Sequence, residues 1–169
     1  WQTFKDGIVR EWALTNGIGG YAGSSLIGAH NRTHQGYLIA SLHPPIERYL
    51  VFSKINESVA VMDGETKTVY DLETSQHKKD GQTVYANGQQ YLTEFCYDGS
   101  VHFTYHAGAV TLKKNICLKQ VENVCAVGYE LENDGPDAAI TLVPLFNFRE
   151  HSASSTPATL RFTTTQTKS

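Results

Sequence analysis

Short apolar runs separated by turn residues are the feature that most constrains the fold of this chain. Several runs alternate apolar and polar residues with a period of two, the spacing of a strand with one buried face. Aspartate or asparagine precedes glycine between many of them, and both residues tolerate the positive φ of tight hairpin turns. No window of eleven or more residues carries an apolar stripe at helical spacing. The pattern predicts an all-β fold, an antiparallel β-sandwich of about ten or more short strands. The expected strands contain Trp12–Leu14, Leu38–Ala40, Tyr49–Phe52, Val59–Met62, Thr66–Leu72, Leu92–Tyr97, Val101–Tyr105, Val110–Leu118, Val124–Leu131 and Ala139–Leu145.

Two hairpins are expected from the turn chemistry. One joins residues 95–97 to 101–103 around Asp98-Gly99, and the other joins residues 129–131 to 139–141 around Asp134-Gly135-Pro136. The polar residues 74–80 are predicted to form a surface loop. Near the carboxyl end, Leu160–Phe162 is compatible with one last strand, and residues 163–169 form a polar tail that is expected to fray.

Length and charge limit the classes of function. A chain of 169 residues suits one domain, expected to span residues 1–169. A net charge of −3 gives no electrostatic case for nucleic-acid binding, and no run of about 18 apolar residues predicts a membrane span. The chain starts at Trp1 without a signal-like segment, so a cytoplasmic piece of a longer protein is expected. Its three cysteines, Cys96, Cys117 and Cys125, are expected to be reduced and mostly buried.

No catalytic or metal-binding constellation is visible in the sequence. A glycosidase needs two facing carboxylates, and the spacing pairs none of Glu11, Glu47, Glu57, Glu94 and Glu150. The histidines lack metal-ligand spacing, and the G-x-S-x-G nucleophile elbow is absent. The glycine run at 17–20 is not followed by the helix of a dinucleotide site. We therefore expect no catalytic residue, no metal and no cofactor.

The residues that remain are suited to recognition of sugars. Flat aromatic rings pack on pyranose faces, while amide, guanidinium and imidazole groups bond hydroxyls. Such side chains gather near the glycine-rich segment and again after a predicted buried strand. Two interpretations stay open for the first group, a sugar-binding loop or a set of core and loop-tying contacts, whereas Trp12 is expected to be a core aromatic. The candidate glucan-binding residues are Tyr21, Arg32, His34, Gln35, Tyr37, Arg149 and His151.

The order of these segments resembles the amino-terminal domain of bacterial and archaeal glycogen debranching enzymes. The likeness lies in Glu11-Trp12 followed by Thr15–Tyr21, in Gly28–Ala40, and in Pro44-Pro45 before Arg48. It continues in residues 50–57, in Phe95 and in residues 142–151. The family commonly reads Thr-Arg-Arg/Lys-Tyr-His-Gly where this chain has residues 31–36, Asn-Arg-Thr-His-Gln-Gly, so its histidine lies one position earlier.

The resemblance implies a supersandwich-like domain that precedes an (α/α)₆ barrel, which would carry the acid and base of an amylo-α-1,6-glucosidase. The present chain is then expected to be non-catalytic. Its expected partners are an α-glucan, such as glycogen, starch or a maltooligosaccharide, and the catalytic domain of the same protein. Two alternatives are an independent α-glucan-binding module and a purely structural docking domain.

Overall fold

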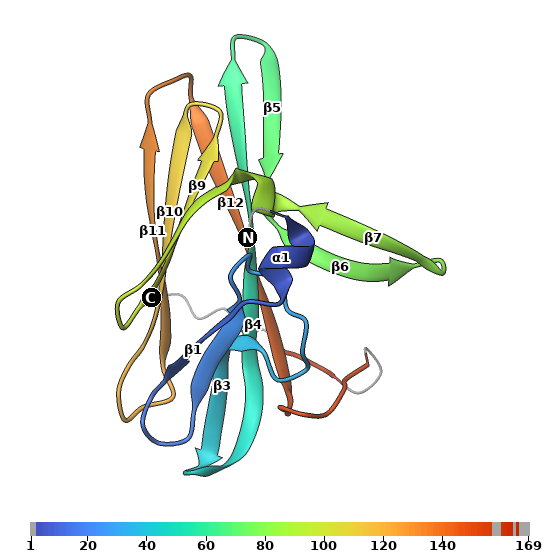
Figure 1. The fold of residues 1–169 in the computed structure, drawn as a ribbon, viewed down its shortest axis with the longest axis vertical. Helices are drawn as coiled ribbons and strands as arrows, with labels where there is room; N and C mark the ends of the chain where they lie inside the picture. Colours follow the sequence, from blue (N-terminus) through green and yellow to red (C-terminus); the bar gives the residue numbers. More distant parts are fainter. Residues whose placement is uncertain (1–2, 157–159, 164, 166–169) are drawn as a thin grey trace.

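The computed structural model describes residues 3–156, 160–163 and 165, and these form two facing antiparallel sheets and a projecting hairpin (Figure 1). The larger sheet contains β1 (Glu11–Thr15), β2 (Tyr21–Ser25), β3 (Gly36–His43), β4 (Ile46–Asp63) and β12 (Ala138–Glu150), with β5 (Thr66–Asp71) paired to β4. The smaller sheet has the order β11 (Cys125–Asn133), β10 (Val110–Leu118), β9 (Val101–Ala107) and β8 (Leu92–Tyr97). The hairpin contains β6 (Thr74–Lys79) and β7 (Gln82–Asn87). Two short helices, α1 (Phe4–Ile8) and η1 (Gly88–Tyr91), complete the described elements.

The core lies between the two sheets and draws side chains from both. Residues of β9 and β10 are alternately buried and less buried, as the period of two predicts. The Trp12 ring of β1 meets the Phe103 ring of β9 edge-on, with centroids 6.4 Å apart. Trp12 is buried, so its expected core position is confirmed. The predicted all-β antiparallel sandwich is therefore correct.

Strand β4 is much longer than the sequence pattern suggested. The separately expected strands Tyr49–Phe52 and Val59–Met62 belong to one strand of 18 residues. Its neighbour β12 has 13 residues and pairs with β4 along almost its whole length, with bulges near Phe146. These two strands are the longest in the larger sheet and lie side by side in it (Figure 1).

One predicted hairpin is confirmed and the other is wrong. Strands β8 and β9 pair across Asp98-Gly99, with Tyr97 opposite Val101. Strands β11 and β12 do not pair with each other, because β11 pairs with β10 and β12 pairs with β4. The turn at Asp134 is present, but it carries the chain from one sheet to the other. A turn signal is local and does not specify which sheet receives the next strand.

Three other expectations need correction. Residues 74–79 form strand β6 rather than a loop; four of its six residues are exposed, so polarity concealed the strand. Residues 160–162 are not in a strand. Cys96 is exposed and the other two cysteines are half-buried, so the thiols are free but less buried than expected. Most of the tail expected to fray, residues 164 and 166–169, lies outside the described residues. No helix in the described part is long and apolar enough to cross a membrane.

Candidate functional site

A buried ion pair between the two sheets is the most distinctive polar feature of the structure. Lys114 of β10 places its Nζ 2.7 Å from Glu57 Oε1 of β4, and the side chains are only 2% and 4% exposed. Both residues occupy strand positions that otherwise point apolar side chains into the core. A single buried charge is very costly, so each of these groups requires the other.

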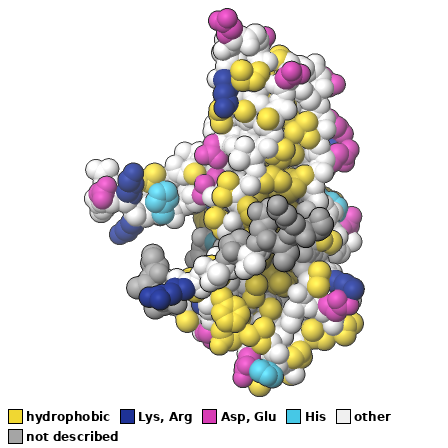
Figure 2. All heavy atoms as spheres, turned by 180° about the vertical axis from the view of Figure 1, so that it is seen from behind, with side chains coloured by type: hydrophobic (Ala, Val, Ile, Leu, Met, Phe, Trp, Pro, Cys, Tyr) yellow, Lys and Arg dark blue, Asp and Glu magenta, His cyan; other side chains and the backbone are white. Residues whose placement is uncertain are grey.

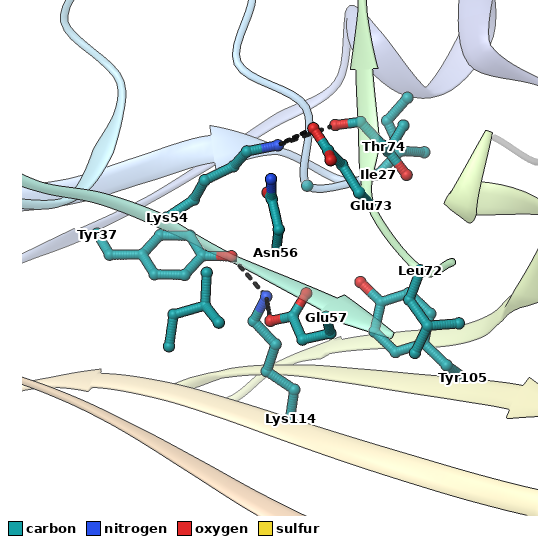
Figure 3. Close-up of a pocket in the computed structure, with 12 residues that line it drawn as sticks. Ile27, Tyr37, Lys54, Asn56, Glu57, Leu72, Glu73, Thr74, Tyr105 and Lys114 are labelled. Carbon is teal, nitrogen blue, oxygen red and sulfur yellow. Dashed lines mark hydrogen bonds and ion pairs between the residues drawn. The ribbon is translucent and has the colours of Figure 1, made fainter. Parts of the chain in front are cut away.

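Two tyrosines complete this buried network, of which Figure 3 shows Tyr37 beside Lys114 and Glu57. Lys114 Nζ donates a hydrogen bond to Tyr37 Oη at 2.6 Å, and Tyr129 Oη donates to Glu57 Oε1 at 2.6 Å. Burial raises the pKa of both phenols, because it disfavours the phenolate, and the Glu57 carboxylate raises them further. The hydroxyls therefore stay protonated. The four side chains join strands β3, β4, β10 and β11 across the core.

A small polar space lies beside the network. Lys54 Nζ is 3.4 Å from Glu73 Oε1 and donates to the Thr74 carbonyl at 3.4 Å, while burial lowers the pKa of Lys54. Asn56 Oδ1 faces no hydrogen-bond partner among the described residues. The space measures about 10 Å³, which admits one water molecule. It is too small for a sugar ring, so the network acts as a structural element rather than as a substrate pocket.

Four of the residues expected to bind glucan come together around one loop: Arg32, His34 and the buried Gln35 lie in it, and Tyr21 contacts it from the start of β2. The Tyr21 hydroxyl donates to the His34 carbonyl at 2.9 Å. The Arg32 guanidinium pairs with Glu11 at 2.6 Å, and Gln35 Nε2 donates to the same carboxylate oxygen at 3.3 Å. Gln35 Oε1 also accepts from the backbone of residues 31 and 32. Burial raises the pKa of Tyr21. Many of these polar groups therefore tie the loop together.

The second predicted cluster lies against the same loop. Arg149 Nη2 donates to the Thr33 carbonyl, and Nη1 donates to the carbonyls of residues 150, 151 and 153. His151 is paired with the Glu150 carboxylate. The structure thus brings Arg149 to the loop that the sequence pattern singled out, although 116 residues separate it from Thr33. A depression of about 170 Å³ beside Tyr21, His34 and Gln35 is the nearest hollow.

Tyr37 is the exception among the predicted site residues. It is 1% exposed, its ring meets Phe52 edge-on at 5.6 Å, and its hydroxyl is engaged by Lys114. A side chain in this position has no face to offer a sugar. We therefore use the name loop cluster for Tyr21, Arg32, His34, Gln35, Arg149 and His151 only.

The glycine-rich segment connects three loops at one end of the sandwich. Gly19 has φ +98°, and an added Cβ would lie 2.6 Å from the Pro45 carbonyl oxygen, so only glycine fits there. Arg48 Nε donates to the Gly19 carbonyl at 2.7 Å. Fully buried Asn16 donates to the Glu122 carbonyl at 2.9 Å, which fixes the β10–β11 loop. The glycine-rich segment therefore holds the β3–β4 turn and the β10–β11 loop against each other.

An aromatic groove along β12 is the feature that the sequence analysis missed. Phe146 stacks on Phe52 and Phe148 stacks on Tyr49, each pair with centroids 5.1 Å apart. Phe146 and Phe148 are nevertheless 61% and 52% exposed, and Phe162 beside them is 62% exposed. With Val51, Asn147 and Thr163, these rings line a groove of about 560 Å³. A sequence signal was available, because Phe146 and Phe148 alternate with Asn147 and Arg149 at the period of two that places both rings on one face of a strand.

Apolar side chains are not confined to this groove. Figure 2 shows them gathered in a band that runs along the back of the molecule. The exposed residues of β12 include Leu142 and Val143 in addition to the two phenylalanines. Large exposed apolar patches on a folded domain are typical of surfaces that contact another protein, a ligand or a membrane.

The described residues include several acidic and histidine side chains that are candidates for catalysis or metal binding by type. They contain no group of three or more His, Cys, Asp or Glu side chains that could hold a metal ion. The acidic side chains considered from sequence each have a partner within the domain. Glu11 contacts Arg32, Glu47 contacts His43, Glu57 contacts Lys114, Glu94 contacts Thr104 and Glu150 contacts Ser152.

Comparison with known proteins agrees with the resemblance drawn from the sequence. Comparison with curated proteins and with solved structures gives no match. The sequence model of one family, glycogen debranching enzyme N terminal, matches residues 10–169. That match covers almost the whole chain, including the glycine-rich segment, the loop cluster and β12. The chain therefore belongs to the family of glycogen debranching enzyme N-terminal domains.

Proposed function

We propose that this domain is a non-catalytic part of a glycogen-debranching-type glycoside hydrolase of the cytoplasm. It packs on the catalytic domain of the same protein through the aromatic groove, and its loop cluster contributes to binding of the α-glucan. The observation that carries the proposal is the exposure of Phe146, Phe148 and Phe162 in one groove. Membership of an amino-terminal domain family supports a catalytic domain as the occupant of that groove.

The chemistry of the groove favours a protein surface over a sugar. Its rings are phenylalanines, which lack the hydroxyl that would add a hydrogen bond to a glucose unit. Interfaces between domains bury such apolar surface, and aromatic residues are enriched at the centre of interfaces. The stacked pairs Phe146–Phe52 and Phe148–Tyr49 hold the exposed rings in place before docking.

The loop cluster suits an auxiliary role in glucan binding. The aromatic ring of Tyr21, the imidazole of His34 and the amide of Gln35 lie beside a depression of about 170 Å³, and the Arg32 guanidinium bonds Glu11, which also lines it. Its internal hydrogen bonds hold these groups in fixed positions, which lowers the entropic cost of binding. Because many of the donors are already engaged, the cluster is expected to add contacts to a glucan held elsewhere rather than to bind it tightly alone.

Docking is tested with the two parts of the enzyme as separate polypeptides. The chain and the proposed catalytic domain are mixed and examined by sedimentation velocity. A stable complex is expected, and the double variant Phe146→Ser/Phe148→Ser should weaken it at least about tenfold, since buried aromatic residues dominate interface energies. Val69→Ser is the matched control, because Val69 is an exposed residue of β5. Equal association of both variants with the catalytic domain would refute the docking role.

Two alternatives have separate signatures. An independent α-glucan-binding module would give measurable heat with maltoheptaose when the chain is titrated alone. A purely structural docking domain would give no heat, and loop-cluster variants such as Arg32→Ala would leave glucan turnover of the joined enzyme unchanged. The proposed function lies between them, with weak binding by the chain alone and a clear effect of the loop cluster in the joined enzyme.

A further inference from the structure

The outer face of the sheet formed by β8, β9, β10 and β11 carries another hollow. None of its lining residues belongs to the loop cluster. Residues of three neighbouring strands line it together with the intervening Phe103, Lys114 and Tyr129, and six of them face outward: His102 and Thr104 of β9, Lys113 and Asn115 of β10, and Gly128 and Glu130 of β11. We call it the outer-sheet groove. Its volume is about 410 Å³, within the range of small-molecule sites. All six residues belong to the strand phase that points away from the core, since the alternate residues Phe103, Lys114 and Ile116 are buried.

Gly128 forms the open floor of the groove. It lies opposite Asn115, which in turn lies opposite His102, so the three residues form one row across the sheet. A Cβ added to Gly128 would meet no atom within 4 Å, and its backbone is ordinary strand without positive φ. Neither conformation nor packing therefore requires glycine here. Glycine in a strand interior weakens the strand, and one reason for it is the close approach of a ligand.

The polar groups above this floor are held in fixed orientations. The His102 ring lies between Asp98 Oδ1, 3.0 Å from Nε2, and Asn115 Nδ2, 3.0 Å from Nδ1. Lys113 Nζ lies 2.5 Å from Glu132 Oε1 and 3.6 Å from Glu130 Oε1. Positioned donors and acceptors of this kind reduce the side-chain entropy lost when a ligand binds. Exposed side chains without such partners would lose more conformational entropy when they bind a ligand.

The balance of charge defines the class of ligand. The ammonium of Lys113 is offset by two carboxylates, so no free positive charge remains to hold a phosphate or carboxylate. The carboxylates are in turn bonded to Lys113, so they do not form a cation site. What remains is the spare capacity of amide, hydroxyl and carboxylate groups that already bond neighbouring side chains, Thr104 to Glu94 among them, because their oxygens can accept a further hydrogen bond from a sugar hydroxyl. A neutral polyhydroxylated molecule fits this set best.

We propose that the outer-sheet groove is a saccharide-binding subsite that holds one or two glucose units of an α-glucan. The subsite is separate from the loop cluster and from the aromatic groove. It rests on the proposed function only for the choice of α-glucan as the saccharide. It contains no exposed aromatic platform among its lining side chains, so the affinity of the isolated chain is expected to be millimolar.

The test is titration of the ¹⁵N-labelled chain with maltoheptaose, followed by amide chemical shifts. Shifts are expected for residues 102, 115 and 128, and glucose 1-phosphate at the same concentration should bind no more tightly than maltose. Gly128→Val fills the floor with a residue that favours strands, so the variant should fold at least as well as the natural chain. It is expected to lose at least about tenfold in affinity at this site. Ala126→Val is the matched control, because Ala126 lies on the same face of β11 two residues away and is exposed.

Each outcome decides the proposal. Shifts at residues 102, 115 and 128 that vanish in Gly128→Val and persist in Ala126→Val support it. Shifts confined to the loop cluster would overturn the subsite and leave the proposed function intact. Shifts at the outer-sheet groove alone would support the subsite and count against a glucan role for the loop cluster. The absence of any shift at saturating sugar, or equal loss in both valine variants, would overturn it.

Discussion

Lys114 and Glu57 form a salt bridge of 2.7 Å in the interior of the sandwich, from strands of opposite sheets. Neither side chain is more than 4% exposed. Tyr37 and Tyr129 bond the pair at its two ends, at 2.6 Å each. The pair therefore fixes how the two sheets sit on each other, since a shift of either strand by one residue would leave a charge unpaired in the core.

Removing one member of the Lys114–Glu57 ion pair is expected to lower the unfolding free energy strongly. Lys114→Met leaves the Glu57 carboxylate buried with only the Tyr129 hydroxyl as a side-chain donor. Breaking a buried ion pair in this way costs about 3–5 kcal/mol of unfolding free energy. Urea denaturation at pH 7 measures it. The double variant Lys114→Met/Glu57→Leu removes both charges and should be more stable than Lys114→Met by at least about 1 kcal/mol. A double variant less stable than the single one would contradict this account.

Gly88 occupies a position where packing alone excludes a side chain. Its added Cβ would lie 2.1 Å from the Leu72 carbonyl oxygen, and its amide donates to the Glu73 carbonyl at 2.8 Å. The β7–η1 junction and the chain before β6 are therefore in direct contact. Gly88→Ala should lower the unfolding free energy by about 1–3 kcal/mol, the usual cost of overpacking. Gly128→Ala serves as the comparison, because its Cβ meets open space; it should be neutral or stabilising, and thermal denaturation of both variants distinguishes them.

Local sequence signals predicted the architecture well where one strand follows another in the same sheet. The Asp63-Gly64 and Asp98-Gly99 turns close hairpins, with Asp63 opposite Thr66 and Tyr97 opposite Val101. The Asp134 turn has the same chemistry but joins different sheets. Sheet membership depends on which apolar faces pack together, and that information is not local. Strand β6 was not predicted because most of its residues are exposed. A strand without a buried face shows no alternation of apolar and polar residues in its sequence.

The site was predictable in part. Lys114 follows Val110 and Leu112 in the apolar phase of β10, and Glu57 lies between Ile55 and Val59 in the same way. A charge at such a position indicates a buried pair, although the sequence does not say which partner it meets. The approach of Arg149 to Thr33 depends on tertiary packing across 116 residues. The aromatic and polar composition around Tyr37 leaves a sugar contact and a core position equally open, and the structure places it in the core, because the first six residues of β3 are buried.

The loop cluster gives a direct test of glucan contact. Arg32 is exposed and pairs with Glu11, and exposed pairs of this kind contribute only about 0–1 kcal/mol to stability. Arg32→Ala should therefore leave the unfolding free energy nearly unchanged while weakening glucan binding or turnover in the joined enzyme several-fold. Lys119→Ala is the control, because Lys119 forms an exposed pair with Glu122 at 2.6 Å on another loop. Unchanged kinetics in Arg32→Ala would remove Arg32 from the glucan contact.

His30 is expected to make the folded domain less stable at acidic pH. Its Nε2 is buried without a hydrogen-bond partner among the described residues, and its ring lies edge-on to Tyr37 at 6.4 Å. Burial, and to a lesser extent the charges of Lys54, Lys114 and Arg149, lower the pKa of His30 from 6.5 to about 3. The imidazole is therefore neutral in the folded protein at any pH in which the domain is expected to function.

The direction of the pH effect follows from the two states. The unfolded chain binds a proton on His30 below about pH 6.5, whereas the folded chain does so only near pH 3, so stability falls as pH falls between these values. From pH 7.5 to pH 5 the contribution of His30 is a loss of about 2 kcal/mol. Urea denaturation of the natural chain and of His30→Gln at both pH values isolates it, because the other titrating groups are shared. Equal pH dependence in the two proteins, or an imidazole C2 proton that titrates near pH 6.5 by NMR, would show that His30 is solvated in the folded state.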